Sequence, residues 1–341
     1  MTIKDIARES GYAVGTVSRV LNNHPDVSEK ARERILAVVA KNGYTQNANA
    51  KNLKQSVNRS LLVLVKGVRN ELFAALVEQL QGLVNNTPYT LLVDYFDEDT
   101  DEVQRAITLC AEKKPQGILF LGGNADNFKR SFGRITLPAV LVTSPAEGLD
   151  YPNLSSVTTD DFEASVQAVR VLLEHGHRHI AIIGGRPSFS DVSGQRFAGG
   201  RAAFVQSGLP AKNLVEYGEA RFCYEEGYQA MHHVLEEHPE ITAAYAIADV
   251  VAIGAMRAAQ DAGRTVGKDL SIIGFDGLAL GEYLTPRLAT IGQSVERLAQ
   301  EATDTLLDVI ENGAPARRVT VPFTVISGES VGLGPGAQAK M

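Results

Sequence analysis

The sequence has no tryptophan, only two cysteines and no apolar run long enough to cross a membrane. A transmembrane helix needs about 20 predominantly apolar residues, so we expect no membrane span. The opening stretch MTIKDIARES carries acidic groups and no apolar core, which predicts a cytoplasmic protein without a secretory signal. Cys110 and Cys223 are isolated and have no metal-ligand spacing around them. They predict buried thiols in a reducing compartment, with no metal site and no cofactor.

Charge is divided unevenly along the 341 residues, whose formal net charge is −7. Residues 1–60 hold ten Lys and Arg against five Asp and Glu, a net +5, so the remainder carries −12. A basic head on an acidic body suggests that the head meets a polyanion, although ordinary solvated surfaces can carry the same charge. The length predicts two or three domains.

Residues 1–45 contain three short helical patterns, each with apolar residues spaced three and four apart. Thr2 and Asp5 have the spacing of a capping box, Gly11 favours a left-handed helix end, and Ser28 is placed to cap the third helix. The apolar positions are Ile3, Ile6 and Ala7, then Val17, Val20 and Leu21, then Ala31, Ile35, Val38 and Val39. Helix, tight turn, helix and supporting helix is the order of a helix-turn-helix unit.

Burying Val17, Val20 and Leu21 turns a polar face of the second helix outward. The side chains on that face suit nucleic-acid contacts, since hydroxyls and guanidinium groups hydrogen bond to base edges and phosphates. They are Gly15, Thr16, Ser18, Arg19 and Asn22. A small three-helix domain that merely has a polar face is the alternative interpretation.

The head resembles the DNA-binding head of the lactose/galactose-repressor (LacI/GalR) family almost throughout. TVSRVLN, VSEKARERI and the closing NGY match in order over more than forty residues. The resemblance implies binding to double-stranded operator DNA. It also implies that Val14 and Gly15 do most to set the operator sequence, with Val14 against a thymine methyl group.

Residues 46–59 have too little apolar content to fold alone, which is typical of a flexible linker. In the family this segment is a hinge that becomes helical on the operator and inserts a leucine into the minor groove. The resemblance therefore implies DNA contacts by Ala50, Leu53 and Lys54, with Leu53 as the wedge. Gln46 and Ala48 depart from the proline and arginine that are common in the family.

From Ser60 onward, β-rich runs alternate with amphipathic helical stretches, which predicts parallel sheets covered by helices on both faces. The predicted strands are LLVLVKG, YTLLVDY, GILFLGG, AVLVTS, HIAIIGG, AAYAIA and LSIIGFD. Ligands of such sheets bind beyond the carboxyl ends of the strands. HGHRHIAIIGG, RFAGGRAAF, AIADVVAIGAMRAAQDAG and VGKDLSIIGFDG also resemble the family and, through it, periplasmic sugar-binding proteins.

The fold expected from pattern and resemblance together is an all-α helix-turn-helix head joined to an α/β body. The body is two doubly wound parallel-sheet lobes, periplasmic-binding-protein-like, joined by three crossovers around an effector cleft. Lobe 1 is expected at about residues 60–158 and 292–322, lobe 2 at about 159–291 and 323–331, and a flexible tail at 332–341.

The resemblance implies that the cleft residues are Phe73, Arg196, Phe222, Asp249, Asp276 and Gln293. Arg and Asp can bind paired sugar hydroxyls, and an aromatic ring can stack on a sugar. Alternatively, Arg196 and Asp276 form a lobe-bridging ion pair, and the two phenylalanines are plain core. Ala248 and Thr143 replace polar residues that are common in the family, so a sugar phosphate, a disaccharide or a purine stays open beside a simple sugar.

The resulting hypothesis is a non-enzymatic repressor that binds operator DNA as a homodimer or tetramer and responds to a small effector. A sugar-binding protein without a regulatory role and a purine-dependent regulator are the alternatives. The sequence shows no assignable catalytic constellation, and it leaves open whether the effector induces or corepresses.

Overall fold

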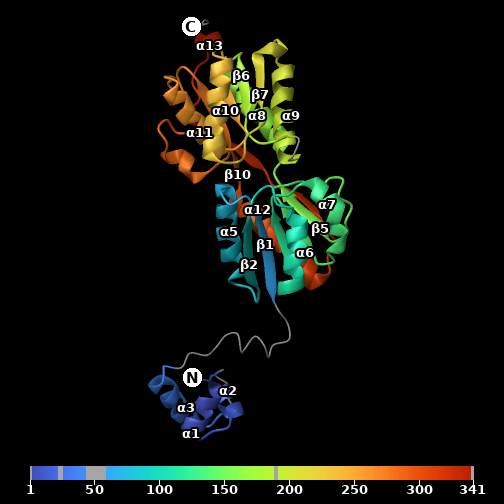
Figure 1. The fold of residues 1–341 in the computed structure, drawn as a ribbon, viewed down its shortest axis with the longest axis vertical. Coiled ribbons are helices and arrows are strands. Elements are labelled where there is room, and N and C mark those ends of the chain that lie inside the picture. The colour runs from blue at the N-terminus through green and yellow to red at the C-terminus, as the bar shows by residue number, and fades with distance from the viewer. Residues whose placement is uncertain (1, 22–25, 44–58, 188–190, 339–341) are drawn as a thin grey trace. The chain divides into compact units, whose positions relative to one another are not determined.

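The computed structural model describes residues 2–21, 26–43, 59–187 and 191–338. The chain divides into two compact units, Met1–Asn58 and Arg59–Met341 (Figure 1). The first unit is the helical head, and the second is an α/β body made of two lobes.

The head consists of α1 (Ile3–Ser10), α2 (Val14–Leu21) and α3 (Glu29–Lys41). At the start of α1, the Asp5 carboxylate accepts hydrogen bonds from both the amide and the hydroxyl of Thr2. Gly11 ends the helix in the left-handed conformation, with φ 78°. Ser28 precedes α3 in an extended conformation, but its side chain makes no capping hydrogen bond. Ile6, Val17, Val20 and Ile35 are buried together and form the core of the head.

Lobe 1 is a parallel six-stranded sheet with the order β11-β5-β4-β3-β1-β2. Its strands are β1 (Ser60–Lys66), β2 (Thr90–Phe96), β3 (Gly117–Leu121), β4 (Ala139–Val142), β5 (Leu154–Thr158) and β11 (Arg318–Thr320). Its helices are α5 (Glu71–Val84), α6 (Glu102–Lys113), α7 (Ala125–Ser131) and α12 (Val295–Asn312). Side chains alternate between the two faces of β1. Leu61, Val63 and Val65 join the core under α5 and α12, whereas Leu62 and Leu64 join the core under α6 and α7.

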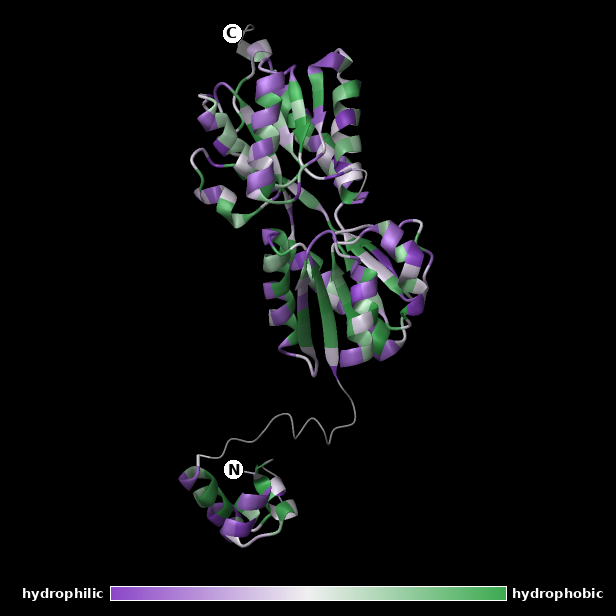
Figure 2. Cartoon of the chain, in the orientation of Figure 1, coloured by the Kyte–Doolittle hydropathy of each residue, from purple (hydrophilic) through white to green (hydrophobic). Residues whose placement is uncertain are grey.

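Lobe 2 is a second six-stranded sheet, β12-β10-β9-β8-β6-β7, in which only the β10–β12 pair is antiparallel. The strands are β6 (Ile180–Ile183), β7 (Leu214–Tyr217), β8 (Ala243–Ala246), β9 (Ser271–Asp276), β10 (Ala289–Gln293) and β12 (Phe323–Ile326). The helices are α8 (Asp161–Glu174), α9 (Asp191–Gln206), α10 (Tyr224–Glu237), α11 (Asp249–Asp261) and the short α13 (Pro335–Gln338). Figure 2 shows the apolar strands enclosed between helices whose outer sides are polar.

Three connections join the lobes: β5 to α8, β10 to α12, and β11 to β12. Because both sheets are parallel in their centres, the carboxyl ends of β1 and β3 in one lobe and of β6 and β9 in the other meet at this junction (Figure 1). The fold therefore places strand-end residues from both lobes around one cleft.

The end of the chain differs from the flexible tail expected for residues 332–341. The amides of Gly334 and Gly336 donate to the carbonyls of His175 and Gly176, at 2.8 and 3.2 Å. The ring of His177 hydrogen bonds to the Gly332 carbonyl. The expectation is wrong for residues 332–338, because these backbone groups find partners at the end of α8, and residues 339–341 lie outside the described residues. Among those described, no helix is both long and apolar enough to span a membrane.

Candidate functional site

The second helix of the head carries the residues for which the sequence predicts DNA contacts. Val17 and Val20 are buried against α1 and α3, which leaves Gly15 and Arg19 exposed on the opposite face of α2. Val14 is 39% exposed, so its side chain is available for contacts outside the head. Thr16 and Ser18 are partly exposed. The predicted contacts Asn22, Ala50, Leu53 and Lys54 lie outside the described residues, as does most of the predicted hinge.

A cleft of about 390 Å³ lies between the two lobes of the body. Of the six predicted effector contacts, four line it, namely Phe73, Arg196, Phe222 and Asp276. Two lining residues, Thr143 and Asp276, have positive φ values of 66° and 125° although neither is glycine. Such conformations are costly and concentrate at functional sites, so their position on opposite walls supports a binding role for the cleft.

The wall from lobe 2 is organised around Arg196, which is only 3% exposed. Its guanidinium donates to Asp161 at 2.7 Å and to the Ile247 carbonyl at 2.6 Å, and reaches Asp276 at 3.5 Å. It also lies 3.7 Å from the ring centroid of Phe275. All four partners belong to lobe 2. The ion pair between Arg196 and Asp276 therefore does not bridge the lobes. Together with the contact to Asp161, it connects α8, α9 and β9 within lobe 2.

Gln293 and Asp249 do not line the cleft, in contrast to the sequence prediction. Gln293 stands behind the wall, where its amide donates to Asp276 at 2.9 Å and its carbonyl accepts from Thr159 at 3.0 Å. It can position Asp276, but it does not itself face the cleft.

Asp249 is fully buried inside lobe 2. Its carboxylate accepts hydrogen bonds from the Thr290 hydroxyl at 2.6 Å and the Leu278 amide at 2.7 Å. Burial raises the pKa of Asp249, and the neighbouring Asp276 carboxylate raises it further. A Cβ atom added to Gly274 would lie 2.1 Å from this carboxylate, so the glycine makes room for Asp249 to turn under the sheet.

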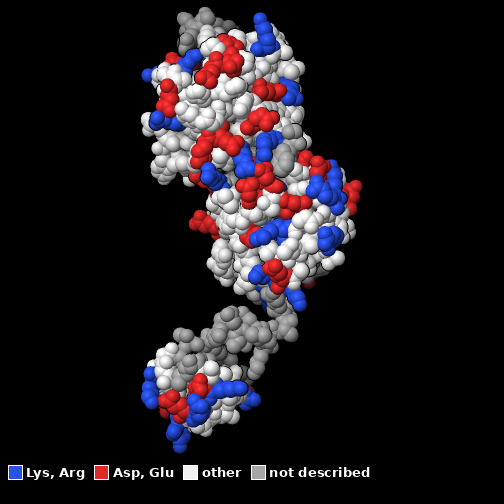
Figure 3. Space-filling view, in the orientation of Figure 1, with Lys and Arg blue, Asp and Glu red and all other residues white. Residues whose placement is uncertain are grey.

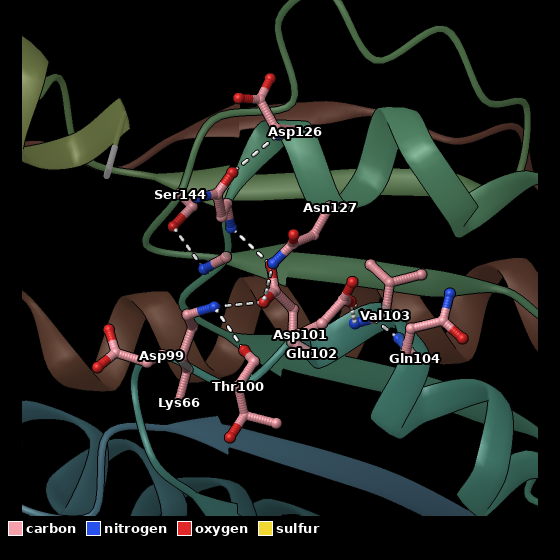
Figure 4. Close-up of polar contacts among 12 residues, drawn as sticks. Lys66, Asp99, Thr100, Asp101, Glu102, Val103, Gln104, Asp126, Asn127 and Ser144 are labelled. Carbon is pink, nitrogen blue, oxygen red and sulfur yellow. Dashed lines mark hydrogen bonds and ion pairs between the residues drawn. The ribbon is translucent and has the colours of Figure 1, made fainter. Parts of the chain in front are cut away.

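On the wall from lobe 1, Lys66 ends β1 and Glu102 begins α6, and the two form an ion pair. Figure 4 shows the Lys66 ammonium directed at Glu102 and at the Thr100 carbonyl, 3.0 Å away. Glu102 is 0% exposed and also accepts from the Asn124 amide at 2.6 Å and the Asn127 side chain at 3.0 Å. Lys66 therefore lines the cleft, and the buried Glu102 carboxylate balances its charge.

The two phenylalanines, Phe73 and Phe222, are each partly core and partly lining of the cleft. Phe73 is 7% exposed and its ring packs on Gly122, where an added Cβ would lie 3.1 Å from the ring. Phe73 is therefore mostly core, with one edge in the cleft. Phe222 is only partly buried and packs against both core clusters of lobe 2, so it has more surface to offer a ligand. Cys223 beside it is buried, Cys110 is half-buried, and neither forms a disulfide.

Several lining residues were not predicted, most clearly an acidic loop after β2 and two arginines across the cleft. Arg186 donates to Glu98 at 2.7 Å and to Asp99 at 2.6 Å. Arg221 forms ion pairs with Asp97 at 3.2 Å, with Glu98 at 3.4 Å and with Asp99. Figure 3 shows acidic and basic atoms side by side at the waist between the lobes. The end of β2 was a predicted strand end, so the acidic run that follows it was the available signal.

Metal binding finds no geometric support within the described ranges, where no three His, Cys, Asp or Glu side chains gather as a metal site would need. His177, between two other histidines in the sequence, is buried and hydrogen bonds to Thr242 and the Gly332 carbonyl.

The comparisons with known proteins agree on one family. Residues 2–47 match the model for bacterial regulatory proteins of the lacI family, and residues 169–331 match the periplasmic binding protein-like domain. The HTH-type transcriptional regulator MalR of Clostridium butyricum is 34% identical over 340 residues, which cover 97% of this chain and 99% of MalR. The chain belongs to the LacI family. A second relative in this family, the HTH-type transcriptional repressor PurR of Photorhabdus laumondii, is 30% identical over 98% of both chains.

Solved structures of LacI-family proteins show the same fold. The Lac repressor dimer bound to operator and the anti-inducer ONPF superposes with a TM-score of 0.79 at 23% identity, covering 97% of this chain and 98% of that one. The CelR–cellobiose complex gives 0.69 at 24% identity and coverages of 97% and 99%. A regulator from Weissella paramesenteroides with bound sucrose also gives 0.69 at 24% identity, over 81% and 99%. This LacI-family chain is a DNA-binding transcriptional regulator with a helix-turn-helix head and a periplasmic-binding-protein-like body.

Proposed function

We propose that the protein is a cytoplasmic repressor that binds a near-palindromic operator as a homodimer and changes its affinity when an uncharged sugar fills the cleft. The observation that carries the proposal is a polar, strand-end cleft between two lobes in a chain whose head exposes Arg19 and Val14. Binding of sugar would favour one arrangement of the lobes and so alter the spacing of two heads, which is linkage between the two sites. No catalytic activity is proposed.

The charge balance of the cleft favours an uncharged ligand. Five basic side chains line it, and each is paired with at least one carboxylate: Lys66, Arg69, Arg186, Arg196 and Arg221. An anionic group would find no uncompensated cation among them. Paired charges still offer hydrogen-bond donors and acceptors, which suit hydroxyl groups. A volume of about 390 Å³ is in the range of small-ligand sites and accommodates a mono- or disaccharide.

Two sugar-bound structures of the same fold, with cellobiose and sucrose, support this ligand class. The 30% identity to PurR supports a second candidate, a regulator that depends on a purine corepressor. The two candidates differ in the ligand, so one experiment separates them.

The experiment combines a thermal-shift screen with a gel-shift assay. Cellobiose, sucrose, ribose, ribose 5-phosphate and the purine bases are tested for an increase in melting temperature, since a ligand that binds only the folded state stabilises it. A sugar that raises the melting temperature should also change binding to the DNA upstream of the gene. Stabilisation by purines alone would favour the second candidate. Failure to shift any palindrome there or beside neighbouring genes, with and without ligands, would contradict the regulator itself.

Two variants test the DNA contacts. Arg19→Ala should weaken operator binding, because the exposed guanidinium supplies donors to base edges or phosphates. Leu53→Ala should reduce specific affinity more than non-specific affinity, because a wedge acts only on DNA that it can bend. Operator binding by Leu53→Ala that equals wild type would contradict the assigned hinge.

A further inference from the structure

The acidic loop Asp97–Asp99 belongs to lobe 1, but its ionic partners belong to lobe 2. The loop is folded around its first carboxylate, which accepts a hydrogen bond from the Asp99 amide at 3.0 Å. Glu98 is the least exposed of the three acids, at 19%, and contacts both arginines of the opposite wall, Arg186 and Arg221. Three carboxylates therefore meet two guanidinium groups across the cleft.

Two arginines at neighbouring strand ends are a common arrangement for binding a phosphate, because guanidinium forks match phosphate oxygens in two-point contacts. Here both forks are engaged by carboxylates of the same chain. Arg186 is 27% exposed and Arg221 35% exposed, so neither is sealed from a ligand in the cleft. What stands between an anion and these arginines is the acidic loop itself.

We propose that the loop Asp97–Asp99 acts as a built-in anion that occupies Arg186 and Arg221 and thereby makes the cleft select uncharged ligands against phosphorylated ones. The proposal rests on the proposed function and names the ligand class of the same cleft. A phosphate must displace carboxylates that are held next to the arginines at high effective concentration. It must then lie beside the displaced carboxylates, whose like charge repels it.

Uncharged sugars meet neither obstacle. A hydroxyl can accept from guanidinium protons or donate to the carboxylates without breaking the ionic contacts. Glu226 lies at the same wall and accepts from the Arg221 amide at 2.6 Å, which adds a further negative charge near the arginines. Selection thus follows from the charge of the loop and not from the size of the cleft.

The test uses inorganic phosphate as the probe, in isothermal titration calorimetry on the full-length protein. The acidic loop is neutralised at constant size in the variant Asp97→Asn/Glu98→Gln/Asp99→Asn. Wild type should show no saturable phosphate binding, and the variant should bind phosphate saturably, at least about tenfold more tightly than the weakest binding that the titration detects. Adding Arg186→Met and Arg221→Met to the variant should abolish that gain, which assigns the binding to these arginines.

A single substitution guards against failure of the triple variant to fold. Asp99→Asn removes the carboxylate that lies nearest to both arginines, and it should show the same gain in smaller measure. Asp94→Asn is the matched control, since Asp94 lies in β2 and pairs with Arg105 of its own lobe. It should leave phosphate binding at the wild-type level.

The proposal is overturned if wild type binds phosphate through the two arginines, or if neither the triple variant nor Asp99→Asn gains affinity over Asp94→Asn. Operator binding is measured by gel shift on the same preparations. Absence of operator binding would contradict the proposed regulator and leave the phosphate result unaffected, so the two failures can be told apart.

Discussion

Replacing Arg196 by methionine asks whether this side chain holds lobe 2 together or serves only as a ligand contact. Arg196 is 3% exposed and Asp161, its partner at 2.7 Å, is 6% exposed. The substitution keeps most of the side-chain volume but leaves the Asp161 carboxylate buried without its cation. Removing one member of a buried ion pair costs about 3–5 kcal/mol, far more than a surface pair.

The assay is urea unfolding followed by far-UV circular dichroism. With a denaturant slope of about 3 kcal/mol/M, the unfolding midpoint should fall by about 1 M or more. The double variant Arg196→Met/Asp161→Asn should regain part of this loss, because the charge of Asp161, the nearer of the two carboxylates beside Arg196, is then removed as well. As a control, Arg201→Met breaks an exposed pair with Glu216, side chains 54% and 28% exposed, and should change stability by no more than about 1 kcal/mol.

Two results would refute this reasoning. One is an Arg196→Met midpoint equal to that of the Arg201→Met control. The other is a double variant that is less stable than Arg196→Met, since that would mean that the unpaired carboxylate is not the source of the cost. Sugar binding that is lost while the midpoint stays at the wild-type value would leave Arg196 as a ligand contact alone.

Three further predictions concern the frame of the body. Gly254→Ala should destabilise the protein by about 1–3 kcal/mol in urea unfolding, because the added Cβ would lie 2.1 Å from the backbone of α10. The control is Gly82→Ala, which has open space around it and should be neutral or stabilising by up to about 1 kcal/mol. The raised pKa of Asp249 means that the folded state holds a proton that the unfolded state has released, so wild-type stability should decline as the pH rises above the ordinary carboxyl range. Thermal melts of Asp249→Asn should lack that decline, and a wild type and variant with parallel pH profiles would contradict it. Lys66→Met should lower the melting temperature by leaving Glu102 unpaired, and adding Glu102→Gln should restore much of it.

The sequence predicted the strands that end at the cleft better than it predicted which side chains point into the cleft. Short continuous apolar runs such as residues 61–65 and 180–183 are typical of strands that are buried on both faces of a parallel sheet. These runs therefore predicted where the strands end, and with the strand ends the general place of the site. Arg196 and Asp276 lie at such ends and line the cleft. Smaller elements, including β5, β7 and α7, have weaker patterns and were not predicted.

Asp249 shows why the direction of a side chain could not be predicted from the sequence. It stands at the first position of α11, where a carboxylate can turn either toward the cleft or back under the sheet. The choice is made by Gly274 on the neighbouring strand and by the donors from Thr290 and Leu278, all distant in sequence. The pairing of Asp97–Asp99 with Arg186 and Arg221 depends in the same way on how the two lobes face each other.

Each wall of the cleft carries a basic side chain that is paired with a buried carboxylate. A sugar site needs strong, fixed donors, but a bare buried cation would be costly and would attract anions. Lys66 on one wall and Arg196 on the other each have a carboxylate placed on the side away from the ligand, Glu102 and Asp161. Such pairs seldom add stability over apolar residues of similar size, so their presence at the lining of the cleft is best explained by the oriented N–H groups that they present there.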